Sequence, residues 1–68
     1  MSKAEVLAAI NDHTGTILDG SERIDSLGID SLEYLDLLLG LERASGKSLD
    51  RGLAFSIETT GELAERFA

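Results

Sequence analysis

The chain has 68 residues, 43% of them hydrophobic, a formal net charge of −7 and no cysteine. A chain of this length buries only about 60% of its unfolded surface, so it can form one small domain with a thin core. Without cysteine, neither disulfides nor thiolate metal sites can stabilise it. Three aromatic residues and no proline favour a helical bundle over a sandwich or barrel, which would need more β-branched and aromatic residues at alternating positions.

The first helix is predicted to run from the N-terminus to about His13. Ser2 stands three residues before Glu5, which is the capping-box spacing, in which each side chain satisfies a free backbone N–H of the other residue. A basic side chain such as His13 interacts favourably with the free carbonyls of a last turn, and Gly15 marks the end of the helix. The inward face would contain Val6, Leu7 and Ile10.

Residues 14 to 30 are expected to form a long surface loop. They include three glycines and several acids, and they show no helical periodicity before Ser31. A loop this long in a small domain is usually functional or disordered. The apolar residues expected to pin it to the core are Ile17, Leu18, Ile24 and Leu27.

The second helix is predicted from Ser31 to about Ser45, and it carries two apolar stripes. Asp30 stands three residues before Glu33, which repeats the capping-box spacing. At about 100° per residue, one stripe consists of Tyr34, Leu37, Leu38 and Leu41, which suffices for this helix's share of a small core. The other stripe consists of Leu32, Leu35 and Leu39, and we expect it to be exposed. The alternative is a helix buried on two sides in a broad core.

Two shorter helices are predicted after Gly46. One is expected around Arg51 to Phe55, although Gly52 weakens this prediction. The last is expected over Thr60 to Phe67, because Thr59 stands three residues before a glutamate. Its inward residues would be Leu63, Ala64 and Phe67.

The acidic residues point to a protein partner. From Asp12 to Glu42 there are eight carboxylates, and Arg23 is the only lysine or arginine, so this stretch accounts for the whole net charge of −7. Such a surface disfavours nucleic acids and anionic membranes and favours basic protein surfaces. Leucines edged by Glu33, Asp36 and Glu42 are typical of a docking surface, because the leucines supply burial and the carboxylates steer the partner. An acidic face that serves only solubility is the alternative.

Ser31 is the candidate functional residue at the start of the second helix. We expect Asp30 to cap the helix, Gly28 to permit a close backbone approach, and the Ser31 hydroxyl to project into solvent. The free N–H groups and the positive end of the helix dipole favour a phosphate ester at this position. Taken alone, a serine at a helix start is far more often structural.

The segment Leu27-Gly28-Ile29-Asp30-Ser31-Leu32 resembles the L-G-x-D-S-L signature of acyl carrier proteins. The resemblance extends without a gap from about Ile24 to Phe67 and includes the spacing of the helices. Ser45 departs from it, because many members have an aromatic residue there, and so does Asp50, where many have proline. We expect Phe55 to refill the core volume that is lost.

The resemblance implies an all-α, four-helix bundle with a short third helix and a long loop between helices 1 and 2, formed by residues 1–68 as a single, monomeric carrier domain. It implies that Ser31 receives a 4′-phosphopantetheine arm from coenzyme A and that Asp30 assists recognition by the phosphopantetheinyl transferase. The arm would carry an acyl or aminoacyl group as a thioester and present it to enzymes with basic docking surfaces. The partner-facing residues would be Leu32, Glu33, Leu35, Asp36, Leu39 and Glu42.

Other functions fit the sequence less well. An enzyme is not expected, because a triad of Ser31, His13 and Asp30 would need a base, an orienting acid and an oxyanion hole in one cleft. An acidic helical adaptor without a prosthetic arm stays open, as does the choice among fatty acyl, polyketide and amino acid cargo. The N-terminus lacks the basic and apolar regions of a signal peptide, and no run of about 18 apolar residues is present. We therefore expect a cytoplasmic protein that does not enter the membrane.

Overall fold

The chain folds into four α-helices and one 3₁₀ turn, with no strand. A computed structural model describes residues 1–68. The elements are α1 (Lys3–Thr14), the 3₁₀ helix η1 (Ile24–Ser26), α2 (Ser31–Ser45), α3 (Arg51–Ala54) and α4 (Thr60–Phe67). The all-α bundle with a short third helix is thereby confirmed. None of the helices is both long and apolar enough to cross a membrane.

Capping side chains start the helices where the sequence predicts. Ser2 and Glu5 form a full capping box on α1, with hydrogen bonds of 2.9 Å and 3.1 Å. Asp30 and Thr59 cap α2 and α4 by accepting from the backbone N–H three residues on. The predicted return bond is wrong at these two helices, because neither glutamate side chain bonds back to the backbone of its cap.

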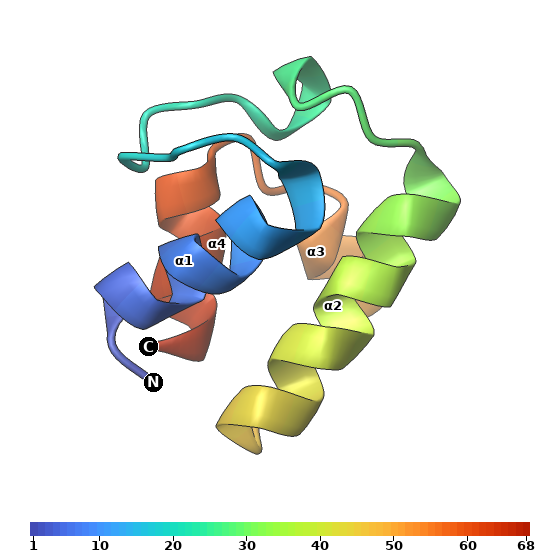
Figure 1. The fold of residues 1–68 in the computed structure, drawn as a ribbon. Coiled ribbons are helices and arrows are strands. Elements are labelled where there is room, and N and C mark those ends of the chain that lie inside the picture. Colours follow the sequence, from blue (N-terminus) through green and yellow to red (C-terminus); the bar gives the residue numbers. More distant parts are fainter.

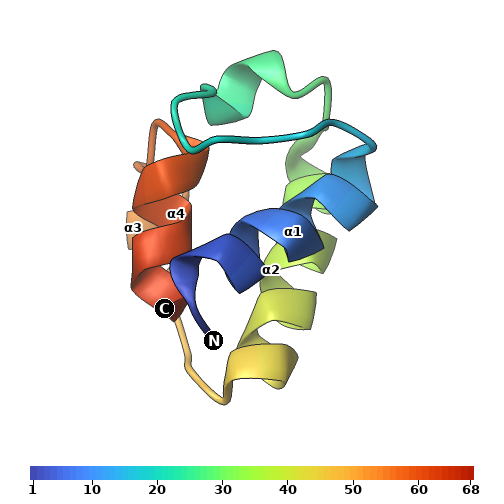
Figure 2. The same cartoon turned by 60° about the vertical axis from the view of Figure 1, so that its left-hand side comes forward.

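The core lies where α1, α2 and α4 meet. Figures 1 and 2 show α1 lying against both α4 and α2, with the two chain ends close together. The predicted inner stripe of α2 is buried, which confirms its assignment to the core. Leu7 of α1 is half-buried at the edge. The ten core residues are Val6, Ile10, Tyr34, Leu37, Leu38, Leu41, Ala54, Leu63, Ala64 and Phe67.

The segment between α1 and α2 crosses one end of the bundle, above the start of α4 (Figure 1). It is not wholly irregular, because η1 lies within it. Leu18, Ile24 and Leu27 are half-buried against the core, as predicted. Ile17 is not an anchor: its side chain is 90% exposed, so that prediction is wrong.

Glu22 fastens this segment to α4. Its carboxylate accepts hydrogen bonds from the backbone N–H of Asp19 at 2.9 Å, from that of Gly20 at 3.0 Å and from the Thr60 hydroxyl at 2.8 Å. These donors, the Asp19 N–H foremost, lower the pKa of Glu22 to about 2. Backbone bonds from Thr60 to Glu22 and from Gly61 to Gly20 add to the attachment. The chain therefore enters η1 and the start of α2 from a fixed point.

Two side-chain links hold α3 against α2. The buried Tyr34 hydroxyl donates to the Ala54 carbonyl at 2.7 Å. At the other end, the Glu42 carboxylate accepts from the Arg51 guanidinium at 2.9 Å and 3.2 Å and from the Leu49 N–H at 2.8 Å. Arg51 thereby holds the pKa of Glu42 below its usual value.

Phe55, which follows α3, does not refill the core as predicted. Its side chain is 51% exposed. The ring instead packs edge-on against that of Tyr34, with centroids 5.2 Å apart. Asp50, at the position where the resemblance would place proline, caps α3 by accepting from the Leu53 N–H at 3.1 Å.

Candidate phosphopantetheine attachment site

A sharp turn delivers the chain to the start of α2. Gly28 has φ of 74°, a left-handed conformation that L side chains rarely adopt. A Cβ at this glycine would meet nothing within 4 Å, so the close approach predicted for it is wrong and the backbone turn is its role. Asp30 then caps α2 by accepting from the Glu33 N–H at 2.8 Å.

Ser31 is exposed in the first turn of α2. Its hydroxyl makes no hydrogen bond within the chain, and the backbone N–H groups of Ser31 and Leu32 have no partner either. Free N–H groups at the positive end of a helix dipole stabilise an anion. The surroundings of Ser31 therefore fit a phosphodiester on its oxygen.

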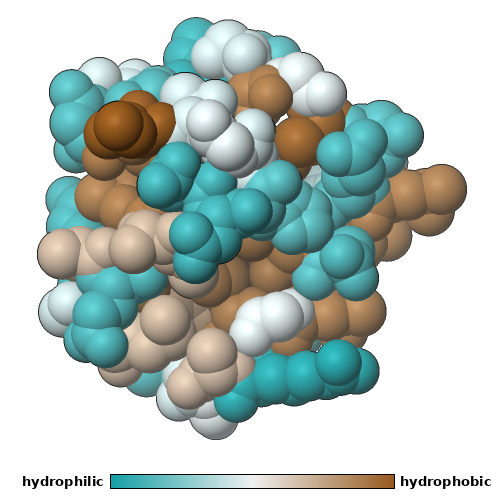
Figure 3. Space-filling model, viewed as in Figure 1, coloured by the Kyte–Doolittle hydropathy of each residue, from teal (hydrophilic) through white to brown (hydrophobic).

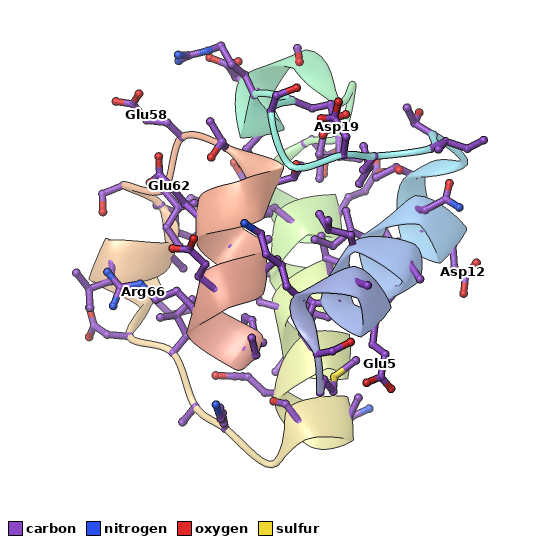
Figure 4. All side chains as sticks on the ribbon, turned by 90° about the vertical axis from the view of Figure 1, so that its left-hand side faces the viewer. Glu5, Asp12, Asp19, Glu58, Glu62 and Arg66 are labelled. Carbon is purple, nitrogen blue, oxygen red and sulfur yellow. The ribbon has the colours of Figure 1, made fainter.

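A hollow of about 430 Å³ adjoins Ser31. Its apolar lining includes Ile24, Ile29, Ile57 and Phe55, together with the core residues Tyr34 and Ala54. Its rim is charged, because Arg23 bonds to Asp25 at 3.2 Å and lies 3.7 Å from Glu58. Arg23 thereby holds the pKa of Asp25 below its usual value. Figure 4 shows Glu58 at the end of the molecule that the α1–α2 segment covers.

The second stripe of α2 is exposed in part. Leu32 is 76% exposed and Leu39 43%, and Figure 3 shows apolar atoms projecting at the edge where α2 begins. Leu35, expected outside the core, is half-buried and packs against it. The helical periodicity places Leu35 between the two stripes, so part of its side chain is buried against the core.

The carboxylates of α2 divide into two groups. Glu33 and Asp36 are exposed and form no ion pair. Glu42, expected to face a partner, is instead occupied by Arg51 and the Leu49 N–H. Its side chain is the less exposed member of that pair. The free acidic edge therefore lies along the first half of α2.

Sequence reasoning missed the exposed apolar side chains beside α3. Leu53 and Phe55 are both about half-exposed. A helix of four residues is too short to show an apolar periodicity, so the sequence carries no signal for them. Phe55 also lines the hollow beside Ser31.

Comparison with known proteins agrees with this geometry. Residues 4–67 match the family model of the phosphopantetheine attachment site. The chain belongs to this family of carrier proteins, which bear a covalent 4′-phosphopantetheine. Carrier domains of the family are generally non-catalytic and interact with the enzymes that modify them and handle their cargo. A search of curated proteins and a search of solved structures each found no match.

Proposed function

We propose that this chain is a carrier whose 4′-phosphopantetheine arm is attached to Ser31 Oγ, and that residues 1–68 act as one carrier domain. The observation that carries this assignment is the Ser31 hydroxyl, exposed and without an internal hydrogen bond at a capped helix start within the family match. The chain has no cysteine, so the thiol needed for a thioester would come from the arm. The carried group would be an acyl or aminoacyl group.

Asp30 has a double role in this proposal. One carboxylate oxygen, Oδ1, accepts from the Glu33 N–H and holds the start of α2. The other oxygen makes no hydrogen bond in the chain, and Asp30 directly precedes Ser31, where the transferase would attach the arm. Recognition of Asp30 by the transferase would therefore use a side chain already fixed in place.

Partner enzymes would dock on α2 between Leu32 and Leu39. Leu32 and Leu39 offer exposed apolar area, and Glu33 and Asp36 offer unpaired carboxylates. This combination suits an apolar surface edged by lysine or arginine, since buried leucine supplies affinity and complementary charge supplies rate and orientation. Leu35 would contribute only its outer edge, and Glu42 is left out because Arg51 occupies it.

Intact-mass measurement tests the attachment. The protein is incubated with coenzyme A and a broad-specificity phosphopantetheinyl transferase, alongside Ser31→Ala and the control Ser26→Ala, which removes another exposed serine of the same connection. The wild type and Ser26→Ala are expected to gain one arm, and Ser31→Ala none. If Ser31→Ala also gains the arm, another residue is the attachment site. If none of the three proteins gains mass, the result favours the acidic adaptor.

A further inference from the structure

Side-chain hydrogen bonds join α2 to α3 and the residues before it at both ends of their contact. Near Ser31, one helical turn along α2, the Tyr34 hydroxyl bonds to the Ala54 carbonyl at 2.7 Å. At the far end, Glu42 bonds to the Arg51 guanidinium at 2.9 Å and to the Leu49 N–H at 2.8 Å. A chain that displaced the Tyr34 hydroxyl would leave the buried Ala54 carbonyl without a partner.

The side chains behind these hydrogen bonds are buried. Leu38, Leu41 and Ala54 are between 0% and 1% exposed, and Tyr34 is 4% exposed. The helix α3 has four residues and supplies one core side chain, Ala54. Tyr34 and Ala54 line the hollow beside Ser31, and both belong to the buried core.

The hollow itself is a poor site for an alkyl tail. Arg23 and its partners Asp25 and Glu58 stand at its rim as exposed ion pairs. A tail laid over these groups would take charges out of water, which costs free energy. The polar rim therefore suits a group that is short or that carries polar atoms of its own.

We infer that Tyr34 separates the carried group from the core, so that the cargo stays outside the bundle and is a short or polar acyl or aminoacyl group. A long alkyl chain on the arm would stay in water, which is unfavourable for apolar surface. Tyr34 thus acts as a specificity determinant of the carrier. This inference rests on the proposed function, because it requires the arm at Ser31.

Thermal unfolding of loaded forms tests the inference. A transferase that accepts acyl coenzyme A loads acetyl, butyryl or octanoyl pantetheine in one step, and intact mass verifies each product. Burial of the octanoyl tail would raise the Tm of this small domain by roughly 10 °C or more over the acetyl form. We expect the three Tm values to coincide. A Tm that rises with chain length would overturn the inference.

Two variants test whether Tyr34 is the barrier. Tyr34→Leu removes the hydroxyl and the outer part of the ring but keeps an apolar side chain, so a gain in Tm from acetyl to octanoyl is expected in this variant. Phe55→Leu, the matched control outside the core, is expected to show no such gain. A Tyr34→Leu protein without the gain would contradict the assignment to Tyr34, and if this variant does not fold, the wild-type series decides the question of burial.

A third design separates this inference from the proposed function. If the intact mass shows no arm on the wild type, the proposed function fails. Access of an alkyl chain to the core is then measured with a variant that needs no arm. Because the chain has no cysteine, Ser31→Cys provides a single thiol that methyl, butyl and octyl methanethiosulfonates modify without a transferase. Equal Tm values for the three adducts support a closed interior, and a rise with alkyl length overturns it.

Discussion

The carboxylate of Glu22 accepts a hydrogen bond from the Thr60 hydroxyl at 2.8 Å, across a separation of 38 residues. Thr60 is fully buried at the start of α4, and Glu22 lies in the segment that leads to Ser31. This bond, with the backbone bonds around it, holds the connection in place at the end of the bundle. The position of the candidate attachment serine therefore depends on α4 as well as on α2.

Replacement of Thr60 by valine should lower the free energy of unfolding by about 1 kcal/mol, because it removes a buried hydrogen bond while the volume stays similar. Amide exchange at Ile24 and Gly61, whose N–H groups bond across the same junction, should become faster. Chemical denaturation measures the first effect and hydrogen exchange the second. Thr16→Val is the control, since Thr16 is exposed. Equal losses of unfolding free energy in the two variants would contradict a stabilising role of the Glu22–Thr60 hydrogen bond.

Acid should destabilise the protein through Glu22. The pKa of Glu22 falls from 4.5 to about 2 on folding, so its stabilising contribution is complete above the unfolded value and is lost as the pH falls from 4.5 towards 2. Glu22→Gln should be less stable than the wild type at neutral pH, and the difference should shrink across that window. Parallel Tm curves for the two proteins from neutral pH down to the folded pKa would contradict this account.

Two glycine-to-alanine variants should have opposite effects. At Gly61 a Cβ would lie 2.7 Å from the Gly20 carbonyl oxygen, so Gly61→Ala should cost roughly 1–3 kcal/mol by overpacking. At Gly40, in the exposed middle of α2, a Cβ would meet nothing within 4 Å. Gly40→Ala should therefore stabilise the protein by about 0.5–1 kcal/mol, the helix-propensity difference. Denaturant titration of both variants checks the signs, and a stabilising Gly61→Ala would refute the close packing.

Charge reversal on α2 should separate docking from folding. Glu33→Lys with Asp36→Lys is expected to slow loading by a cognate enzyme and to leave the fold intact, because neither carboxylate is in an ion pair. Glu42→Gln should have the opposite profile, a lower Tm with loading rates retained, since it weakens the link to Arg51. Steady-state loading kinetics and thermal melts on the same samples distinguish the two. An unchanged loading rate for the double variant would contradict the proposed docking surface.

The parts of the fold that local chemistry determines could be predicted from the sequence. Caps three residues before a glutamate mark helix starts because the side chain of Ser2 or Asp30 accepts from the glutamate N–H within one turn. The stripe around Leu38 repeats at helical spacing, so its burial could be predicted as well. The exposed serine at position 31 follows from the same helix start.

The contacts between distant segments could not be predicted. Nothing near Glu22 indicates Thr60 as its partner, and nothing near Glu42 indicates Arg51, since both pairings arise only when separate elements pack. For the same reason Phe55 lies half outside the core, although its residue type favours burial. Leu35 lies on the boundary between two stripes, where helical periodicity alone does not settle its burial.

The residue that bears the arm can be identified by peptide sequencing, which is the strictest test of the assignment to Ser31. The transferase-treated protein is digested, and tandem mass spectrometry identifies the peptide and the residue that bear the phosphopantetheine. The account predicts the modification on Ser31, in the peptide that also contains Asp30. Modification of any other residue, or an unmodified Ser31 after treatment under conditions that fully convert a known carrier, would contradict it.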